Sequence, residues 1–260
     1  MRLSHTTPAV VLRTRPFGES DKIVSLLTEQ FGKLTGIAKG AMRSRKRFVN
    51  SLEPFALVNL RFQQRSQSNL ALILAADLIV GYRKLSTSLE SISHAAYLVE
   101  ITDGLIGERE ENLAVYQHLR DSLCYLEKHS ASLSFLTSFE LKLLRLVGYR
   151  PVLENCRRCG KDRLTHAARE WHFSLVDGGI LCVSCAHSRR DTLPLGSKAV
   201  EALTALQAEP NGLPLRHPLP LPVIKEMRAV TLQFIQFHMD REIKSAAFLQ
   251  QFSASYSGPN

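Results

Sequence analysis

Apolar and polar residues alternate over short stretches in the first third of the chain, and turn residues separate these stretches. This period of two residues predicts β-strands, which we place at 9–15, 23–28, 34–38, 55–62 and 70–74. Short strands this close together favour a small barrel, because a closed barrel leaves no open sheet edge. The number of strands matches that of an OB-fold.

The hydrophobic period changes near Leu78 to the spacing of a helix. The expected helices cover 85–105, 113–126, 135–146 and 223–241. Ser197 is the expected N-cap of a further helix, and a proline-rich connector at 210–222 follows that helix. The sequence therefore predicts an α+β multidomain protein, with an OB-fold β-barrel in residues 1–80 and an α-helical domain in residues 81–250.

The cysteines suggest a metal site. They form two C-x-x-C pairs, which are Cys156 with Cys159 and Cys182 with Cys185. Two residues between thiolates let both sulfurs reach one ion at about 2.3 Å, so two pairs can surround a tetrahedral zinc ion. Gly178 and Gly179 are expected to supply the positive φ angles of a tight turn before the second pair. We predict one zinc module at about 153–188, inserted in the helical domain; two disulfides in a secreted protein are the alternative.

The expected zinc ion is structural. Four thiolates close the coordination shell, whereas a catalytic zinc ion keeps one position open. The H-x-E motif of zinc deaminases is absent from the sequence. The fifth cysteine, Cys124, lies in an apolar helical stretch and is interpreted as a small buried hydrophobic residue. Cysteines directed mostly at a metal ion fit a reducing cytoplasm.

Positive charge is concentrated in the first domain. Residues 1–81 contain 12 Lys and Arg against 5 Asp and Glu, and the segment 39–47 holds five of these cations. So dense a run repels itself unless it is solvated or neutralised, and a nucleic-acid backbone is a common neutraliser. The alternative is a solvated surface loop that has no binding function. We favour nucleic acid, because the charge is concentrated in one domain and the sequence pI is about 9.5.

The candidate DNA-binding residues fall into two groups. The main group lies in the basic segment and comprises Lys39, Arg43, Arg45, Lys46 and Arg47. The second group lies on strands whose outward faces the sequence does not reveal, and comprises Arg13, Arg15 and Lys33. Phe17 and Phe48 are candidates for stacking on bases, although their apolar neighbours favour a place in the core.

The motifs of common enzyme classes are missing. The sequence contains no Walker A, H-E-x-x-H, G-x-S-x-G or G-x-G-x-x-G motif. The acidic residues of the first domain are scattered singly, which is a poor basis for a two-metal nuclease. We therefore expect no enzymatic activity. The N-terminus has no signal-peptide core, and the longest apolar stretch, 70–80, is too short for a membrane helix and contains Asp77, so we expect a cytoplasmic protein that contacts no membrane.

Four segments have a distinctive combination of residues. They are Gly36–Ala41 with Arg45–Phe48 and Leu52–Phe55; Phe139–Leu144 with Gly148–Pro151; the two cysteine pairs with Gly178 and Gly179; and Arg241–Ser245. Together they span most of the chain, which resembles the bacterial RecO family of DNA recombination proteins, in its zinc-containing subgroup.

The resemblance implies an N-terminal OB domain, a C-terminal helical domain and a structural zinc ion. It also implies binding to single- and double-stranded DNA and annealing of complementary strands. With the partner RecR, such proteins help to load the recombinase RecA onto strands coated by single-stranded DNA-binding protein. The acidic C-terminal tail of that coating protein is a further expected contact. The expected location is the cytoplasm, in association with the bacterial nucleoid. Two alternatives stay open at this point: a zinc-ribbon factor of transcription or the ribosome that uses Arg157, Arg158, Lys161 and Arg163, and a metal-dependent nuclease.

Overall fold

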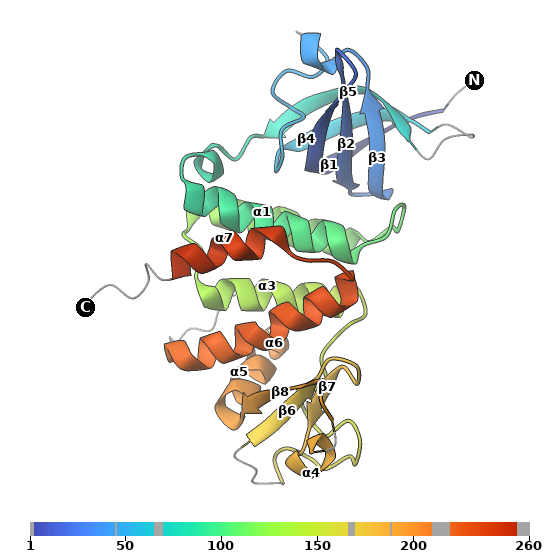
Figure 1. The fold of residues 1–260 in the computed structure, drawn as a ribbon. Coiled ribbons are helices and arrows are strands. Elements are labelled where there is room, and N and C mark those ends of the chain that lie inside the picture. The colour runs from blue at the N-terminus through green and yellow to red at the C-terminus, as the bar shows by residue number, and fades with distance from the viewer. Residues whose placement is uncertain are drawn as a thin grey trace. The chain divides into compact units, whose positions relative to one another are not determined.

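The computed structural model describes residues 3–44, 46–64, 70–165, 170–187, 189–209 and 219–253. The chain divides into two compact units (Figure 1). Unit 1 contains residues 1–130 and 243–260, and unit 2 contains residues 131–242. The last segment of the sequence therefore packs with the first part of the chain, although unit 2 separates them in the sequence.

Unit 1 begins with a closed barrel in the strand order β1-β2-β3-β5-β4. The strands are β1 (Ser4–Phe17), β2 (Asp21–Thr28), β3 (Gly32–Ala38), β4 (Leu57–Gln63) and β5 (Ala71–Val80). Strands β3 and β5 pair in parallel, and the other neighbours pair antiparallel. A strand-rich, OB-like domain at the N-terminus confirms the prediction from the alternating pattern.

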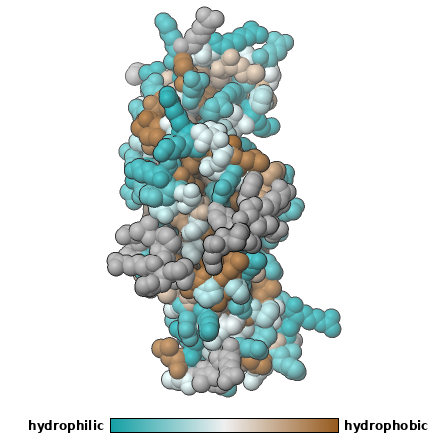
Figure 2. Space-filling model, turned by 90° about the vertical axis from the view of Figure 1, so that its left-hand side faces the viewer, coloured by the Kyte–Doolittle hydropathy of each residue, from teal (hydrophilic) through white to brown (hydrophobic). Residues whose placement is uncertain are grey.

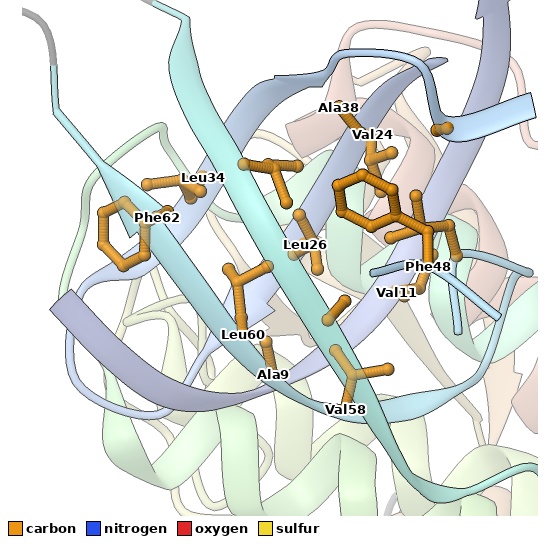
Figure 3. Close-up of a cluster of buried hydrophobic side chains, with 14 of the residues drawn as sticks. Ala9, Val11, Val24, Leu26, Leu34, Ala38, Phe48, Val58, Leu60 and Phe62 are labelled. Atoms are coloured by element: carbon orange, nitrogen blue, oxygen red, sulfur yellow. The ribbon is translucent and has the colours of Figure 1, made fainter. Parts of the chain in front are cut away.

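The barrel interior is filled by apolar side chains at alternating strand positions. In β3 every second residue is buried, which is the period expected when one face of a strand meets a core. Figure 3 shows the ring of Phe48 close to Val11 and Val24 in this core. Phe48 belongs to the segment between β3 and β4, so this connection contributes to the core and is anchored by it.

Helices complete unit 1. They are η2 (Arg83–Ser86), α1 (Leu89–Leu105), α2 (Leu113–Lys128) and α7 (Lys244–Ser253). The Ser88 side chain accepts a hydrogen bond from the Ser91 N–H at 3.1 Å and caps α1, and the Asn112 side chain accepts one from the Val115 N–H at 3.0 Å and caps α2. These caps satisfy N–H groups that have no partner within the helix.

Helix α7 lies alongside α1 (Figure 1). The Glu100 carboxylate accepts hydrogen bonds from the backbone N–H groups of Lys244, at 3.0 Å, and Ser245, at 2.8 Å. A carboxylate at this position also interacts favourably with the positive end of the α7 dipole. Glu100 therefore fixes the start of the C-terminal helix on α1.

Asp103 of α1 connects this helix to the barrel. Its carboxylate forms ion pairs with Arg13 of β1 and with Lys33 of β3, the second at 2.9 Å. The side chains of Lys33 and Asp103 are 14% and 7% exposed, so solvent screens their pair less than it screens surface pairs, whereas the Arg13 side chain is 58% exposed. Arg13 and Lys33, which are candidate DNA contacts from the sequence, thus both pair with the Asp103 carboxylate of the same unit.

The segment that follows α1 covers the first half of β3. The Arg109 N–H donates to the Lys33 carbonyl at 2.8 Å, and the Thr35 hydroxyl donates to Glu108 at 2.7 Å. Gly32 permits this approach, because a Cβ atom there would lie 2.1 Å from the Glu110 carbonyl oxygen. This segment covers the part of the β3 edge that β5 does not reach, since β5 pairs with β3 only from Gly36 onward.

Unit 2 combines helices with a small sheet. Its helices are α3 (Leu133–Leu146), α4 (Val183–Ala186), α5 (Ser197–Ala208) and α6 (Leu221–Met239), and its strands are β6 (Glu170–Ser174), β7 (Gly179–Leu181) and β8 (Thr192–Gly196). The strand order is β7-β6-β8, and both pairings are antiparallel. Helices α3 and α6 lie side by side (Figure 1).

A buried ion pair joins α3 to α6. Glu140 is fully buried, and its carboxylate accepts hydrogen bonds from the Arg228 guanidinium at 2.7 Å and from the Thr231 hydroxyl at 2.6 Å. Hydrogen bonds of this kind offset the cost of removing both charges from water. The pair therefore fixes one relative position of the two helices.

Three details of the predicted elements are wrong. Strand β5 continues to Val80, although we placed the change to helical spacing near Leu78. The N-cap of α5 is Gly196, whose N–H donates to Glu226 at 2.6 Å, and Ser197 is the first helical residue. Helix α7 was not expected. The predicted connector at 210–222 lies outside the described residues up to position 218, and its last two residues belong to α6, which begins at Leu221 and not at Val223.

The surface of the described residues is mixed in polarity. On the face that Figure 2 shows, hydrophobic residues are interrupted by hydrophilic ones. None of the helices in the described part of the chain is both long and apolar enough to cross a membrane.

Candidate metal centre and basic surface

The four cysteines of the two C-x-x-C pairs meet in unit 2. Their sulfur atoms all lie within 4.8 Å of one another, and the sulfurs of Cys159 and Cys182 are 3.7 Å apart. Sulfurs bound at about 2.3 Å to one tetrahedral ion would be about 3.8 Å apart, so the donor set fits a zinc ion. The clustering of the four cysteines agrees with the predicted module.

Each pair sits on a short turn whose backbone is held by hydrogen bonds. The Gly160 N–H donates to the Cys156 carbonyl at 2.9 Å, and Gly160 has the positive φ that this turn needs. The Cys185 N–H donates to the Cys182 carbonyl at 3.0 Å at the start of α4. These turns point both sulfurs of a pair toward the same place.

The two turns are joined through β7. The Val152 N–H donates to the Gly178 carbonyl at 3.0 Å, and the Ile180 N–H donates to the Val152 carbonyl at 3.0 Å. Gly178 has the predicted positive φ of 64°, but Gly179 does not. Gly179 is needed for another reason, because a Cβ atom there would lie 2.4 Å from the Val152 carbonyl oxygen. The interpretation of Gly178 is confirmed, and that of Gly179 is wrong.

Ionisation of the cysteines also favours a cation. Burial opposes the thiolate of Cys156, yet hydrogen bonds from the N–H groups of Cys159, Cys182 and Arg158 lower the pKa of Cys156 to about 6. Desolvation and contacts with the neighbouring thiols raise the pKa of Cys185 to about 12. Four thiolates this close repel one another, so all four ionise together only when a metal ion supplies positive charge. A closed shell of four thiolates is a structural site.

Within the described residues, the four cysteines are the sole group of three or more His, Cys, Asp or Glu residues placed to hold a metal ion. In the barrel, Asp21 accepts a hydrogen bond from the Gly40 N–H at 2.8 Å, and Glu53 pairs with Lys22 at 3.0 Å. These two carboxylates therefore serve local structure.

Some of the cations around the four cysteines are partly neutralised. Asp177 forms ion pairs with Arg189 at 3.1 Å and with Arg158 at 3.8 Å, and its carbonyl accepts from Arg157 at 3.0 Å. The zinc-ribbon alternative placed its nucleic-acid contacts here. The described contacts show that this carboxylate already faces two of the arginines near the site.

The basic segment lies at one end of the barrel, next to the turn between β1 and β2. The Gly40 N–H donates to Asp21, and the Met42 N–H donates to the Ser20 carbonyl at 2.9 Å. The cations Lys39, Arg43, Lys46 and Arg47 are exposed, whereas Arg45 lies outside the described residues. The Arg47 guanidinium donates to the Lys39 carbonyl at 2.9 Å, so Arg47 also holds the segment in place.

The second group of cations is divided. Arg13 and Lys33 pair with Asp103, and Lys33 also donates to the Asp103 carbonyl at 2.7 Å. Arg15 is exposed on β1 and has no ion pair with any described residue. Sequence reasoning missed Asp103, because an acidic residue in a helical stretch gives no sign that it faces strands far away in the chain.

The two aromatic candidates differ in exposure. Phe48 is 5% exposed and belongs to the barrel core, whereas Phe17 is 49% exposed at the end of β1. The interpretation of these residues as core is therefore right for Phe48 and wrong for Phe17.

Comparison with known proteins identifies the family. The model of the recombination protein O N-terminal domain matches residues 1–82, and that of the C-terminal domain matches residues 86–247. DNA repair protein RecO of Anaeromyxobacter sp. strain K is 33% identical over 93% of this chain and 94% of its own length. DNA repair protein RecO of Syntrophus aciditrophicus is 32% identical over 96% of both chains, and that of Myxococcus xanthus is 31% identical over 94% of this chain and 96% of its own length. The chain belongs to the RecO family of DNA repair proteins.

Proposed function

We propose that this protein is a recombination mediator that binds single- and double-stranded DNA, anneals complementary strands and, with RecR, helps to load RecA onto DNA coated by single-stranded DNA-binding protein. The observation that carries the proposal is an exposed basic segment on an OB-like barrel in a chain of the RecO family. Such a surface screens phosphate repulsion between two strands and leaves their base edges free to pair. Annealing of this kind requires no nucleotide hydrolysis.

The DNA contacts of the proposal rest on Lys39, Arg43, Arg45, Lys46 and Arg47, with Arg15 beside them. Arg13 and Lys33 remain weaker candidates for DNA contact, and their pairing with Asp103 also makes them contribute to the placement of α1 on the barrel. One structural zinc ion, held by Cys156, Cys159, Cys182 and Cys185, stabilises unit 2 in this proposal.

Replacing Arg43, Arg45, Lys46 and Arg47 with alanine is expected to weaken DNA binding to a similar degree for all sequences, because phosphate contacts carry no base information. If all four residues contact single-strand phosphates, the slope of log K against log salt becomes shallower by about 3, at about 0.7 per contact. Fluorescence anisotropy over a salt series measures this slope. Replacing Arg157, Arg158, Lys161 and Arg163 with alanine is the control; a shallower slope in that variant alone would move the DNA site to the zinc module.

The mediator function is tested on coated strands. The protein is expected to accelerate pairing of complementary strands that carry single-stranded DNA-binding protein, without nucleotide. We place the contact with the acidic tail of the coating protein on the helical domain. Deleting that tail is therefore expected to abolish annealing of coated strands and to spare naked strands, as followed by a gel-based annealing assay. Absence of annealing on both substrates with the intact proteins would contradict the proposed function.

A further inference from the structure

Phe17 is placed where a base of bound DNA could reach it. It ends β1, pairs with Asp21 across the hairpin and is 49% exposed. A single exposed aromatic residue is ordinary in a folded protein. Its surroundings distinguish Phe17, since the exposed cations of the barrel lie on the elements next to it.

The hairpin that carries Phe17 is tied to the basic segment. The strand partner of Phe17, Asp21, accepts a hydrogen bond from the Gly40 N–H at 2.8 Å. The next residue back, Ser20, accepts one from the Met42 N–H at 2.9 Å. The end of the hairpin and the start of the basic segment are therefore held together without support from a ligand. A site that is already ordered loses less conformational entropy when it binds.

Strand geometry places a cation beside the ring. Arg15 and Phe17 are two positions apart on β1, so their side chains leave the same face of the strand, with Cα atoms about 7 Å apart. Both residues are exposed. One nucleotide of a bound strand can thus present its phosphate to the Arg15 guanidinium and its base to the Phe17 ring.

We infer that Phe17 stacks on a base of single-stranded DNA and so adds a contact that duplex DNA cannot make. The inference rests on the proposed function, because it concerns the same DNA site. An aromatic ring can stack on any exposed base face, so the contact is independent of sequence. In a duplex the base faces are stacked on one another and are not available to the ring.

Two variants test the inference. Phe17→Ala is expected to weaken binding to an oligothymidine by about 5- to 150-fold, the range typical of one lost base–aromatic contact. Binding to a duplex of the same length and the slope of log K against log salt are expected to stay unchanged. On an abasic oligonucleotide, which has phosphates but no bases, wild type and variant are expected to bind equally.

Phe17→Trp supplies a direct signal. The chain has one tryptophan, Trp171, which is 1% exposed in unit 2 and is therefore expected to emit as a buried indole. An exposed indole at position 17 emits at longer wavelength, and its emission is expected to be quenched by oligothymidine and unaffected by the abasic strand. The control is Phe248→Ala, because Phe248 is exposed to a similar degree, 51%, on α7. This control is expected to leave all affinities unchanged.

The outcomes separate the stacking contact from the DNA site as a whole. The inference is overturned if Phe17→Ala binds oligothymidine as tightly as wild type does, or if it loses the same affinity for oligothymidine and for the abasic strand. In both cases the proposed function still stands, provided that wild type binds DNA with the expected salt dependence. No binding of wild type to any of the three DNAs overturns the proposed function. A melting temperature of Phe17→Ala equal to that of wild type excludes unfolding as the cause of a loss of affinity.

Discussion

Replacing Cys156 and Cys182 with serine is expected to remove bound zinc and to lower the melting temperature of unit 2 by at least about 10 °C. Structural zinc contributes up to about 10–16 kcal/mol in small zinc domains, and each kcal/mol shifts the melting temperature of a domain of about 100 residues by about 4 °C or more. Trp171 reports the change, since it is buried in β6 of the same unit. Its emission should shift to longer wavelength at a lower temperature than in wild type.

Cys124→Ser is the matched control for the zinc variant. Cys124 lies on α2 in unit 1 and does not belong to the group of four cysteines. This variant is expected to keep its zinc and the wild-type melting curve of Trp171. Metal analysis that finds no zinc in wild-type protein purified without chelator would contradict the prediction. So would a variant that kept full stability and lost only its binding to DNA.

Glu140→Ala is expected to destabilise unit 2 by about 3–5 kcal/mol, because it leaves the buried Arg228 guanidinium without the carboxylate that now accepts from it. Urea unfolding followed by Trp171 emission measures the loss.

Two further variants make the Glu140 prediction specific. Glu154→Ala breaks an exposed pair with Arg150, and it is expected to cost less than about 1 kcal/mol, since solvent screens that pair. Replacing Glu140 with Leu and Arg228 with Met together should recover most of the loss, because apolar residues of similar volume fill the space without an unpaired charge. An equal loss in Glu140→Ala and Glu154→Ala would show that burial does not govern the strength of the pair.

The sequence predicted those features that neighbouring residues determine. Alternation identified the barrel strands, because each strand turns one of its faces into the barrel core. The spacing within each C-x-x-C pair predicted sulfurs close enough to share one ion, because the chain between two such sulfurs is too short to separate them. These signals act over a few residues, so a single sequence contains them in full.

Features that depend on distant partners were missed or misplaced. Leu78 to Val80 form an apolar run that is ambiguous by itself, and their pairing with β4 makes them strand. Gly196, not Ser197, is the N-cap of α5, and the partner of its N–H is Glu226 from another helix, which lies far away in the sequence. The basic residues illustrate the same limit, since Arg13 and Arg15 look equivalent in the sequence and differ because Asp103 reaches only the first.

The contact between Glu100 and the start of α7 has a consequence for the order of events during synthesis. The ribosome releases the barrel, α1 and α2 long before residues 243–253 are made. Throughout that interval the face of α1 that receives α7 has no partner from its own unit, and Glu100 has no helix to cap. Unit 2 can complete its own core first, so the earliest part of the chain is the last to reach its final set of contacts.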